Sequence, residues 1–254
     1  MAKKILYFFL LFSLYLSAAS IYESSLIGYW KFEDTSGSVI DSTGNKNGTV
    51  QGSVVRGVAG KFGNAFNFDS VGAYVDAGAS STISPVTIEA WVNLNRYDTP
   101  NIFKTIVQIN THYGSNWSDS AFYISNGYLN AYTAGTSATR IALNQWVHVA
   151  MVNDGSYIRF YINGQQDSNT CATSPVWQNG WSFIRLGGGY AGDGENFAGL
   201  LDDVAIYSRA LSSTEIMQHA TIGIEASYVP EPAGIFSMII GVLTVLILSR
   251  HRKN

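Results

Sequence analysis

Short runs in which apolar and polar residues alternate fill most of the chain between Tyr29 and Tyr207, separated by clusters of Gly, Asn, Asp and Ser. Residues 87–94 (TIEAWVNL) show the pattern best, because every second side chain from Ile88 to Leu94 is apolar. Successive side chains of a strand point to opposite faces, so this run predicts a strand with one face in a core. Helix-period patterns are nearly absent from the region, which favours an all-β sandwich or barrel.

The same reasoning predicts strands over further segments. Residues 146–152 (WVHVAMV) are apolar on both faces apart from His148, which is typical of a central strand. Asn163-Gly164 is a two-residue hairpin signal. Ser212 with Glu215 forms a capping box and predicts one short helix over residues 212–220. The other expected strands are residues 27–33, 65–68, 73–77, 103–109, 121–124, 128–133, 157–162, 182–187 and 199–207.

The folded part is expected to be one domain, residues 20–228. A segment of about two hundred residues can bury roughly 70% of the surface its unfolded chain exposes, so one core suffices without metals or disulfides. Cys171 is the only cysteine, which excludes an internal disulfide and leaves a plain thiol or a bond to another chain. The net charge is −3 and no basic stripe precedes the C-terminal tip, so nucleic acid is not an expected partner.

Residues 1–19 have the pattern of a secretory signal peptide. Two lysines precede the apolar run 5–16, and the small residues 17–20 (SAAS) suit signal peptidase, with cleavage expected after Ala19. A retained N-terminal anchor is the alternative, but the apolar run is shorter than a membrane span. We therefore expect the domain to be exported.

The C-terminal residues 229–254 predict a membrane anchor. Residues 233–249 (AGIFSMIIGVLTVLILS) carry no ionisable side chain and predict a transmembrane helix, and the basic cluster Arg250–Lys253 belongs on its cytoplasmic side. With Pro230, Glu231 and Pro232 before the helix, the segment resembles the PEP-CTERM sorting signal of Gram-negative bacteria. The resemblance implies an exosortase-type processing protease and delivery to the cell envelope or to exopolysaccharide. A plain anchor whose prolines end the preceding strand is the alternative.

Five blocks of the exported segment carry recognisable motifs. The blocks are residues 28–33 (GYWKFE) with 41–45 (DSTGN), 63–69 (GNAFNFD) with 74–75, 88–92 (IEAWV), 146–150 (WVHVA) with 161–164 (YING), and 199–212 (GLLDDVAIYSRALS) with 215–216. In this order they resemble a concanavalin A-like, laminin-G type jelly roll. The resemblance implies two curved antiparallel sheets in a sandwich, as the alternation also predicts. Members of that family serve as carbohydrate-binding, adhesive or accessory modules, and many bind calcium.

Calcium is the cofactor that the acidic residues suggest. Ca²⁺ takes six to eight oxygen ligands from carboxylates, carbonyls and water. Asp41 and Asn45 lie in one N-terminal loop, and Asp202 and Asp203 begin the last strand. If the first and last strands are neighbours, as in the family, these oxygens meet. The alternative is that Asx residues in Gly-rich loops form turns without any metal.

A glycan is the expected ligand. Tyr113 and Trp117 are the candidates for stacking on a sugar ring, although aromatic residues at such positions also pack onto sheets. The Gly-rich loop 187–196 carries Asp193 and Asn196, whose side chains would orient hydroxyl groups.

Catalysis has little support in the sequence. Glycoside hydrolysis requires two carboxyl groups flanking one bond, and Glu89 is the only acid on its strand. His148 between two valines is typical of a core histidine, His219 has no motif around it, and no serine occupies a nucleophile elbow. We therefore predict a non-catalytic binding module for glycan or extracellular matrix at the cell envelope. A structural or adhesive surface protein is the alternative, and a glycoside-processing enzyme is the third hypothesis.

Overall fold

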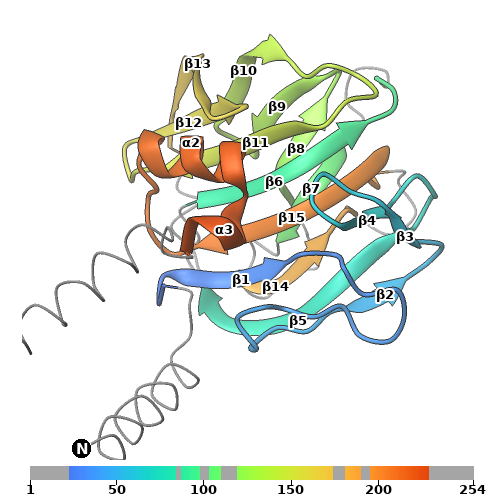
Figure 1. Ribbon diagram of the computed structural model, residues 1–254. Helices are drawn as coiled ribbons and strands as arrows, with labels where there is room; N and C mark the ends of the chain where they lie inside the picture. Colours follow the sequence, from blue (N-terminus) through green and yellow to red (C-terminus); the bar gives the residue numbers. More distant parts are fainter. Residues whose placement is uncertain are drawn as a thin grey trace, which may run out of the picture.

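Two antiparallel sheets face each other in the computed structural model, which describes residues 23–83, 87–97, 103–109, 119–173, 181–189 and 195–228 (Figure 1). The first sheet has the order β13 (Gln165–Ala172), β12 (Tyr157–Ile162), β11 (Val147–Asn153), β6 (Thr87–Leu94), β15 (Gly199–Tyr207), β4 (Asn64–Asn67) and β3 (Val55–Ala59), and β1 (Leu26–Trp30) also pairs with β15. The second has the order β10 (Gly135–Arg140), β9 (Tyr128–Ala131), β8 (Asp119–Ser125), β7 (Lys104–Ile109), β14 (Trp181–Leu186), β5 (Tyr74–Ile83) and β2 (Thr49–Gln51). The all-β sandwich that the alternation predicted is confirmed.

The main core lies between the two sheets. Phe32, Phe66 and Phe68 form an aromatic cluster in it, and the rings of Phe32 and Phe66 stack with their centroids 4.6 Å apart. Phe122 and Ile184 belong to the same core from the second sheet. Each of these five side chains is fully buried, so apolar burial at this interface is the main stabilising contribution to the fold.

Two helices cover the outer face of the first sheet (Figure 1). Helix α2 (Ser213–Ile222) starts at the predicted capping box, since Ser212 and Glu215 each accept a hydrogen bond from the other's backbone N–H. It is followed by α3 (Ile224–Tyr228), which the sequence did not predict. Ile216 and Ile224 pack against Ala150 and Ala205 of the sheet and form a second, smaller core. Strand β6 is therefore buried on both faces.

The hairpin between β12 and β13 turns at Asn163 and Gly164, as predicted. Their φ angles are +50° and +78°, and the left-handed conformation at both central residues is the type I′ requirement. A side chain at Gly164 would also approach Met217 of α2, because an added Cβ would lie 2.9 Å from its sulfur. The turn thus sets the register of the hairpin and the position at which α2 packs against it.

The sequence analysis located the inner strands and missed strands at the sheet margins. β6, β12 and β15 have the predicted bounds, and the expected central strand lies, as β11, between β12 and β6. The opening strand is shorter than expected, because it ends at Trp30 and Phe32 has a φ of +55°. The four strands that were not predicted are β2, β3, β10 and β13.

Neither helix in the part of the chain that the structure describes is long and apolar enough to cross a bilayer. Residues 1–19, the motif Pro230-Glu231-Pro232 and the apolar run 233–249 lie outside the described residues. Export, sorting and membrane anchoring therefore stay predictions.

Candidate functional site

Polar residues cross the outer face of the second sheet in two rows. In the first row, Asp76 of β5 lies opposite Arg185 of β14, and Arg185 lies opposite Gln108 of β7. Residues directly opposite in an antiparallel pair point to the same face. The neighbours Ile184 and Leu186 point the other way, into the main core. Asp76, Arg185 and Gln108 therefore share the outer face.

The second row runs parallel to the first, across β7, β8, β9 and β10. Thr105 lies opposite Tyr123, Tyr123 opposite Asn130, and Asn130 opposite Thr136. The Thr136 hydroxyl donates to the Asn130 side-chain oxygen at 2.6 Å, so the end of this row is already ordered. Thr105, Gln108, Tyr123 and Asn130 are buried, so the members of the two rows that reach the surface are Asp76, Arg185 and Thr136. Partly exposed polar groups of this kind can orient a small polar ligand.

Aromatic rings lie among these polar groups. The guanidinium carbon of Arg185 lies 4.7 Å from the ring centroid of Tyr74 and 4.9 Å from that of Phe183. The rings of Phe103 and Tyr123 pack with their centroids 4.3 Å apart, and burial together with the nearby charge of Glu195 raises the pKa of Tyr123 to about 12. Rings beside hydrogen-bonding groups offer an apolar body and a polar tip to one ligand.

Of the four residues predicted to bind the ligand, the structure describes Asn196. Tyr113, Trp117 and Asp193 lie outside the described residues, so their contact with a ligand stays a prediction. Asn196 is buried, and its amide nitrogen donates to the carbonyl oxygens of Phe68 at 2.9 Å and Phe197 at 3.2 Å. These two bonds hold the loop end against the sandwich, which gives Asn196 a structural role.

The predicted N-terminal calcium ligands form a tight turn. The Asp41 carboxylate accepts five hydrogen bonds, from the backbone N–H groups of Tyr29, Thr43, Asn45 and Lys46 and from the Thr43 hydroxyl. Asn45 also donates weakly through its side chain to Thr43, at 3.4 Å. The arrangement is that of an Asx-type turn, the alternative given above for this loop.

The first and last strands are neighbours, as the calcium hypothesis required, but a tyrosine separates the two acidic groups. Tyr29 donates from its backbone nitrogen to Asp41 at 2.9 Å and from its hydroxyl to Asp203 at 2.5 Å. Asp41 and Asp203 thus contact opposite ends of one residue. Among the described residues, no group of three or more acids, histidines or cysteines is arranged so that it could hold a metal ion. Calcium stays a prediction, which we now centre on Asp202 and Asp203.

Asp202 and Asp203 lie at a bulge in β15. The pairing of β15 with β6 shifts register between Asp202 and Ala205, and Asp203 has a φ of +50°. Oδ2 of Asp202 accepts the backbone N–H groups of Lys61 and Phe62, whereas its buried Oδ1 has no hydrogen-bond partner among the described residues. Burial raises the pKa of Asp202 to about 8 and, despite the Tyr29 hydroxyl, that of Asp203 to about 7.

A buried cluster beneath α2 joins three residues that the sequence analysis treated separately. Oε1 of Glu89 lies 2.8 Å from Nδ1 of His219, and Oε2 lies 3.2 Å from Nε2 of His148, without hydrogen-bond alignment in the second case. Glu89 is the only acid on β6, as expected, but the sequence analysis missed the two histidines that the register of β6 with β11 and the packing of α2 bring to it. The signal available in the sequence was a carboxylate on a strand whose neighbour carries His148.

The charges of this cluster are coupled. Burial alone would raise the pKa of Glu89, but the two histidines outweigh it and lower that pKa to about 2. The pKa of His219 is raised, since attraction to Glu89 outweighs burial, which acts to lower it. Glu89 is fully buried and each histidine nearly so, hence the cluster has no access to a substrate and acts as an internal ion pair.

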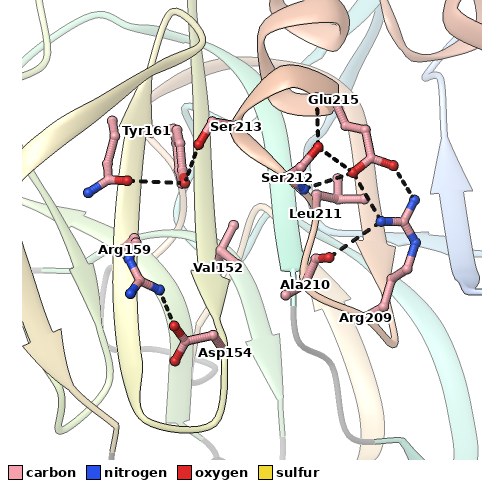
Figure 2. A pocket seen from close by; sticks show the side chains of 11 residues that line it. Val152, Asp154, Arg159, Tyr161, Arg209, Ala210, Leu211, Ser212, Ser213 and Glu215 are labelled. Carbon is pink, nitrogen blue, oxygen red and sulfur yellow. Dashed lines mark hydrogen bonds and ion pairs between the residues drawn. The ribbon is translucent and has the colours of Figure 1, made fainter.

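An open depression of about 660 Å³ lies where α2 begins, between β11, β12 and residues 209–215 (Figure 2). Its charged groups are paired: Arg159 with Asp154, and Arg209 with both Glu23 and Glu215. The Tyr161 hydroxyl lies 3.3 Å from the Ser213 hydroxyl. These contacts hold the start of the helix in place.

Comparison with known proteins gives a family and a set of solved structures. A family model described as the concanavalin A-like lectin/glucanases superfamily matches residues 69–217, more than half of the chain. Comparison with curated proteins finds no match.

Three solved structures illustrate the likeness. Domain 4 of an extracellular arabinanase from Geobacillus stearothermophilus, in complex with arabinotriose, is 20% identical with a TM-score of 0.59, over 79% of this chain and 100% of that one. Trypanosoma rangeli sialidase in complex with sialic acid is 16% identical with a TM-score of 0.59, over 81% of this chain and only 35% of the sialidase. The binding domain of Paraclostridial Mosquitocidal Protein 1 is 18% identical with a TM-score of 0.58, over 77% and 52% of the two chains. Likeness at these identities shows a shared fold.

Proposed function

The chain belongs to the concanavalin A-like lectin/glucanases superfamily, and from this we propose that it is a saccharide-binding module whose outer face of the second sheet receives a glycan. The observation that carries the proposal is the partly exposed group of Asp76 and Arg185 on the outer face, with the rings of Tyr74 and Phe183 against the guanidinium. Sugars present apolar ring faces and a rim of hydroxyl groups, and such a surface offers partners to both. A domain of similar fold, solved in complex with arabinotriose, supports the choice of ligand class.

The cluster around Glu89 is not part of this proposal. Its carboxylate is enclosed by the sheet and α2, so it cannot reach a glycosidic bond. That the protein is not an enzyme stays a prediction, which a hydrolysis assay on any bound saccharide would test.

Binding is expected to depend on Phe183. A glycan array and calorimetry on the purified protein should detect saccharide binding, and Phe183→Ala should weaken it by about 1 kcal/mol, roughly fivefold in Kd, through lost stacking. Tyr157→Ala is the matched control, because Tyr157 is a half-exposed aromatic residue on the first sheet. Equal sensitivity of the two positions, or no saccharide bound at all, would contradict the proposal and favour an adhesive role without a small-ligand site.

We further propose that the module acts outside the cytoplasmic membrane, at the envelope of a Gram-negative bacterium, after export through residues 1–19 and sorting through residues 229–254. The support is the basic cluster Arg250–Lys253 behind an uncharged run of membrane length. A reporter fused after Asn254 should be active only in the cytoplasm, and the mature protein should begin near Ser20. Periplasmic activity of that reporter in the unprocessed chain would reject the orientation.

A further inference from the structure

Among the described residues, Arg185 differs from the three arginines that form ion pairs, because no carboxylate contacts it. Arg96, Arg159 and Arg209 each contact a carboxylate. In the part of the chain that the structure describes, no carboxylate oxygen lies within 4.0 Å of the Arg185 guanidinium. Asp76, directly opposite in the sheet, uses Oδ1 to accept the backbone N–H of Gly78 at 2.9 Å. The positive charge of Arg185 is therefore not neutralised by a direct partner in these segments.

The position of this guanidinium is nevertheless fixed. The rings of Tyr74 and Phe183 contact it at 4.7 and 4.9 Å, and one terminal nitrogen donates to the Gln108 side-chain oxygen at 3.3 Å. Its Nε is buried and has no hydrogen-bond partner among the described residues. A buried N–H group without a partner is unfavourable by about 1 to 3 kcal/mol. The Arg185 side chain as a whole is partly exposed, so its guanidinium can offer the N–H donors that reach the surface to a ligand oxygen.

We propose that Arg185 binds the carboxylate of an acidic saccharide, a sugar acid such as a hexuronate or a sialic acid. A guanidinium offers two parallel N–H donors that match the two oxygens of a carboxylate, and the clamping rings hold it in place. The neighbouring Tyr74, which is partly exposed, would contact the same sugar ring. The inference rests on the proposed function, because it names the class of glycan that the outer face selects. The net charge of the chain is −3, so a preference for acidic sugars would come from this site and not from overall attraction.

Calorimetry on the full-length protein with matched saccharide pairs tests the inference. The pairs are trigalacturonate against galactotriose and sialyllactose against lactose, and sulfated lactose serves as an anion without a carboxylate. At least one acidic member should bind roughly tenfold or more tightly than its neutral match, as expected for hydrogen bonds to a charged group. Arg185→Met should remove this advantage, and Arg185→Lys, which keeps the charge but loses the two parallel donors, should keep only part of it.

Arg159→Met is the matched control, since Arg159 also lies over an aromatic ring, that of Tyr157, on the other sheet. It should change no affinity. Thermal melts check that each variant is folded. If Arg185→Met does not fold, Arg185→Lys still tests the inference. Three results would overturn the inference while the saccharide-binding function stands. They are equal affinity for acidic and neutral sugars, a preference for the sulfated sugar alone, and loss of the preference for acidic sugars in Arg159→Met. Binding of no saccharide would overturn both.

Discussion

Replacing Glu89 by alanine is expected to lower the free energy of unfolding by about 3 to 5 kcal/mol, because removing one partner of a buried ion pair leaves the other charge uncompensated. His219 would lose a contact of 2.8 Å and His148 one of 3.2 Å, and neither ring has water to replace it at exposures of 4% and 1%. Chemical denaturation followed by tryptophan fluorescence measures the change. Glu225→Ala serves as the control, since Glu225 pairs with Lys31 at a half-exposed site where such pairs contribute about 0 to 1 kcal/mol.

The pH dependence gives the same prediction a second readout. The folded pKa of Glu89 lies below its ordinary 4.5, so the stabilisation is complete above that pH and is lost as the pH falls towards about 2. The folded pKa of His219 lies above its ordinary 6.5, so its stabilisation is complete below that pH and is lost as the pH rises through the raised value. The pair should therefore contribute most to the free energy of unfolding between about pH 4.5 and 6.5. Glu89→Ala should flatten the pH dependence of that free energy on both sides of this range. A loss of under about 1 kcal/mol at pH 6 would contradict the ion-pair interpretation.

Calcium at a hundredfold excess over its dissociation constant is expected to raise the free energy of unfolding by about 2.7 kcal/mol, if Asp202 and Asp203 help to bind it. Their raised pKa values, about 8 and 7, mean that the folded state holds protons that the unfolded state releases near pH 3.8. Without metal, stability should therefore fall as the pH rises from about 4 to 8. A bound cation would replace the protons, so calcium should raise the melting temperature most at the alkaline end.

Asp202→Asn and Asp41→Ala separate the two halves of the calcium prediction. Asp202→Asn should remove the rise in melting temperature with calcium and should flatten the dependence of stability on pH. Asp41→Ala should lower stability through five lost hydrogen bonds and leave the calcium response unchanged, since Asp41 and Asp203 contact opposite ends of Tyr29. Asp154→Asn, at an exposed acid paired with Arg159, is the control for a general charge effect. Identical melting curves in chelator and in millimolar calcium would refute the site.

The sequence predicted the inner strands well because each of them has a face in the core. β6 alternates where it contacts the main core, β15 contributes Leu201 before its bulge and Val204 and Ile206 after it, and β12 lies between two strands of its sheet. The missed strands β2, β3, β10 and β13 are the four that end the two sheets. β13 exposes most of its side chains on both faces, so it has no apolar alternation to detect. Hydrophobic periodicity reports burial, and a strand at a sheet margin is defined by backbone hydrogen bonds to one neighbour.

The candidate site was harder to predict because it depends on register between distant strands. Arg185 lies opposite Gln108 only because β14 enters between β5 and β7. Within β7, shifts of register on either side of Val107 place Ile106 and Val107 in the core together, so simple alternation from Thr105 would assign Gln108 to the wrong face. The ion pair of Glu89 with His219 spans 130 residues. No local pattern carries such information.

The placement of β14 and β15 decides when the domain can fold. β14 enters between β5 and β7, and β15 enters between β4 and β6 while also pairing with β1. Both sheets are therefore completed by the last two strands, residues 181–207. Before these strands are made, the four-stranded groups β6–β11–β12–β13 and β7–β8–β9–β10 each have an open edge. Contacts of such long range slow folding, and open edges favour aggregation until they are closed. Nearly the whole domain has to be synthesised before either sheet is complete, so these edges stay exposed on the nascent chain until its final strands are made.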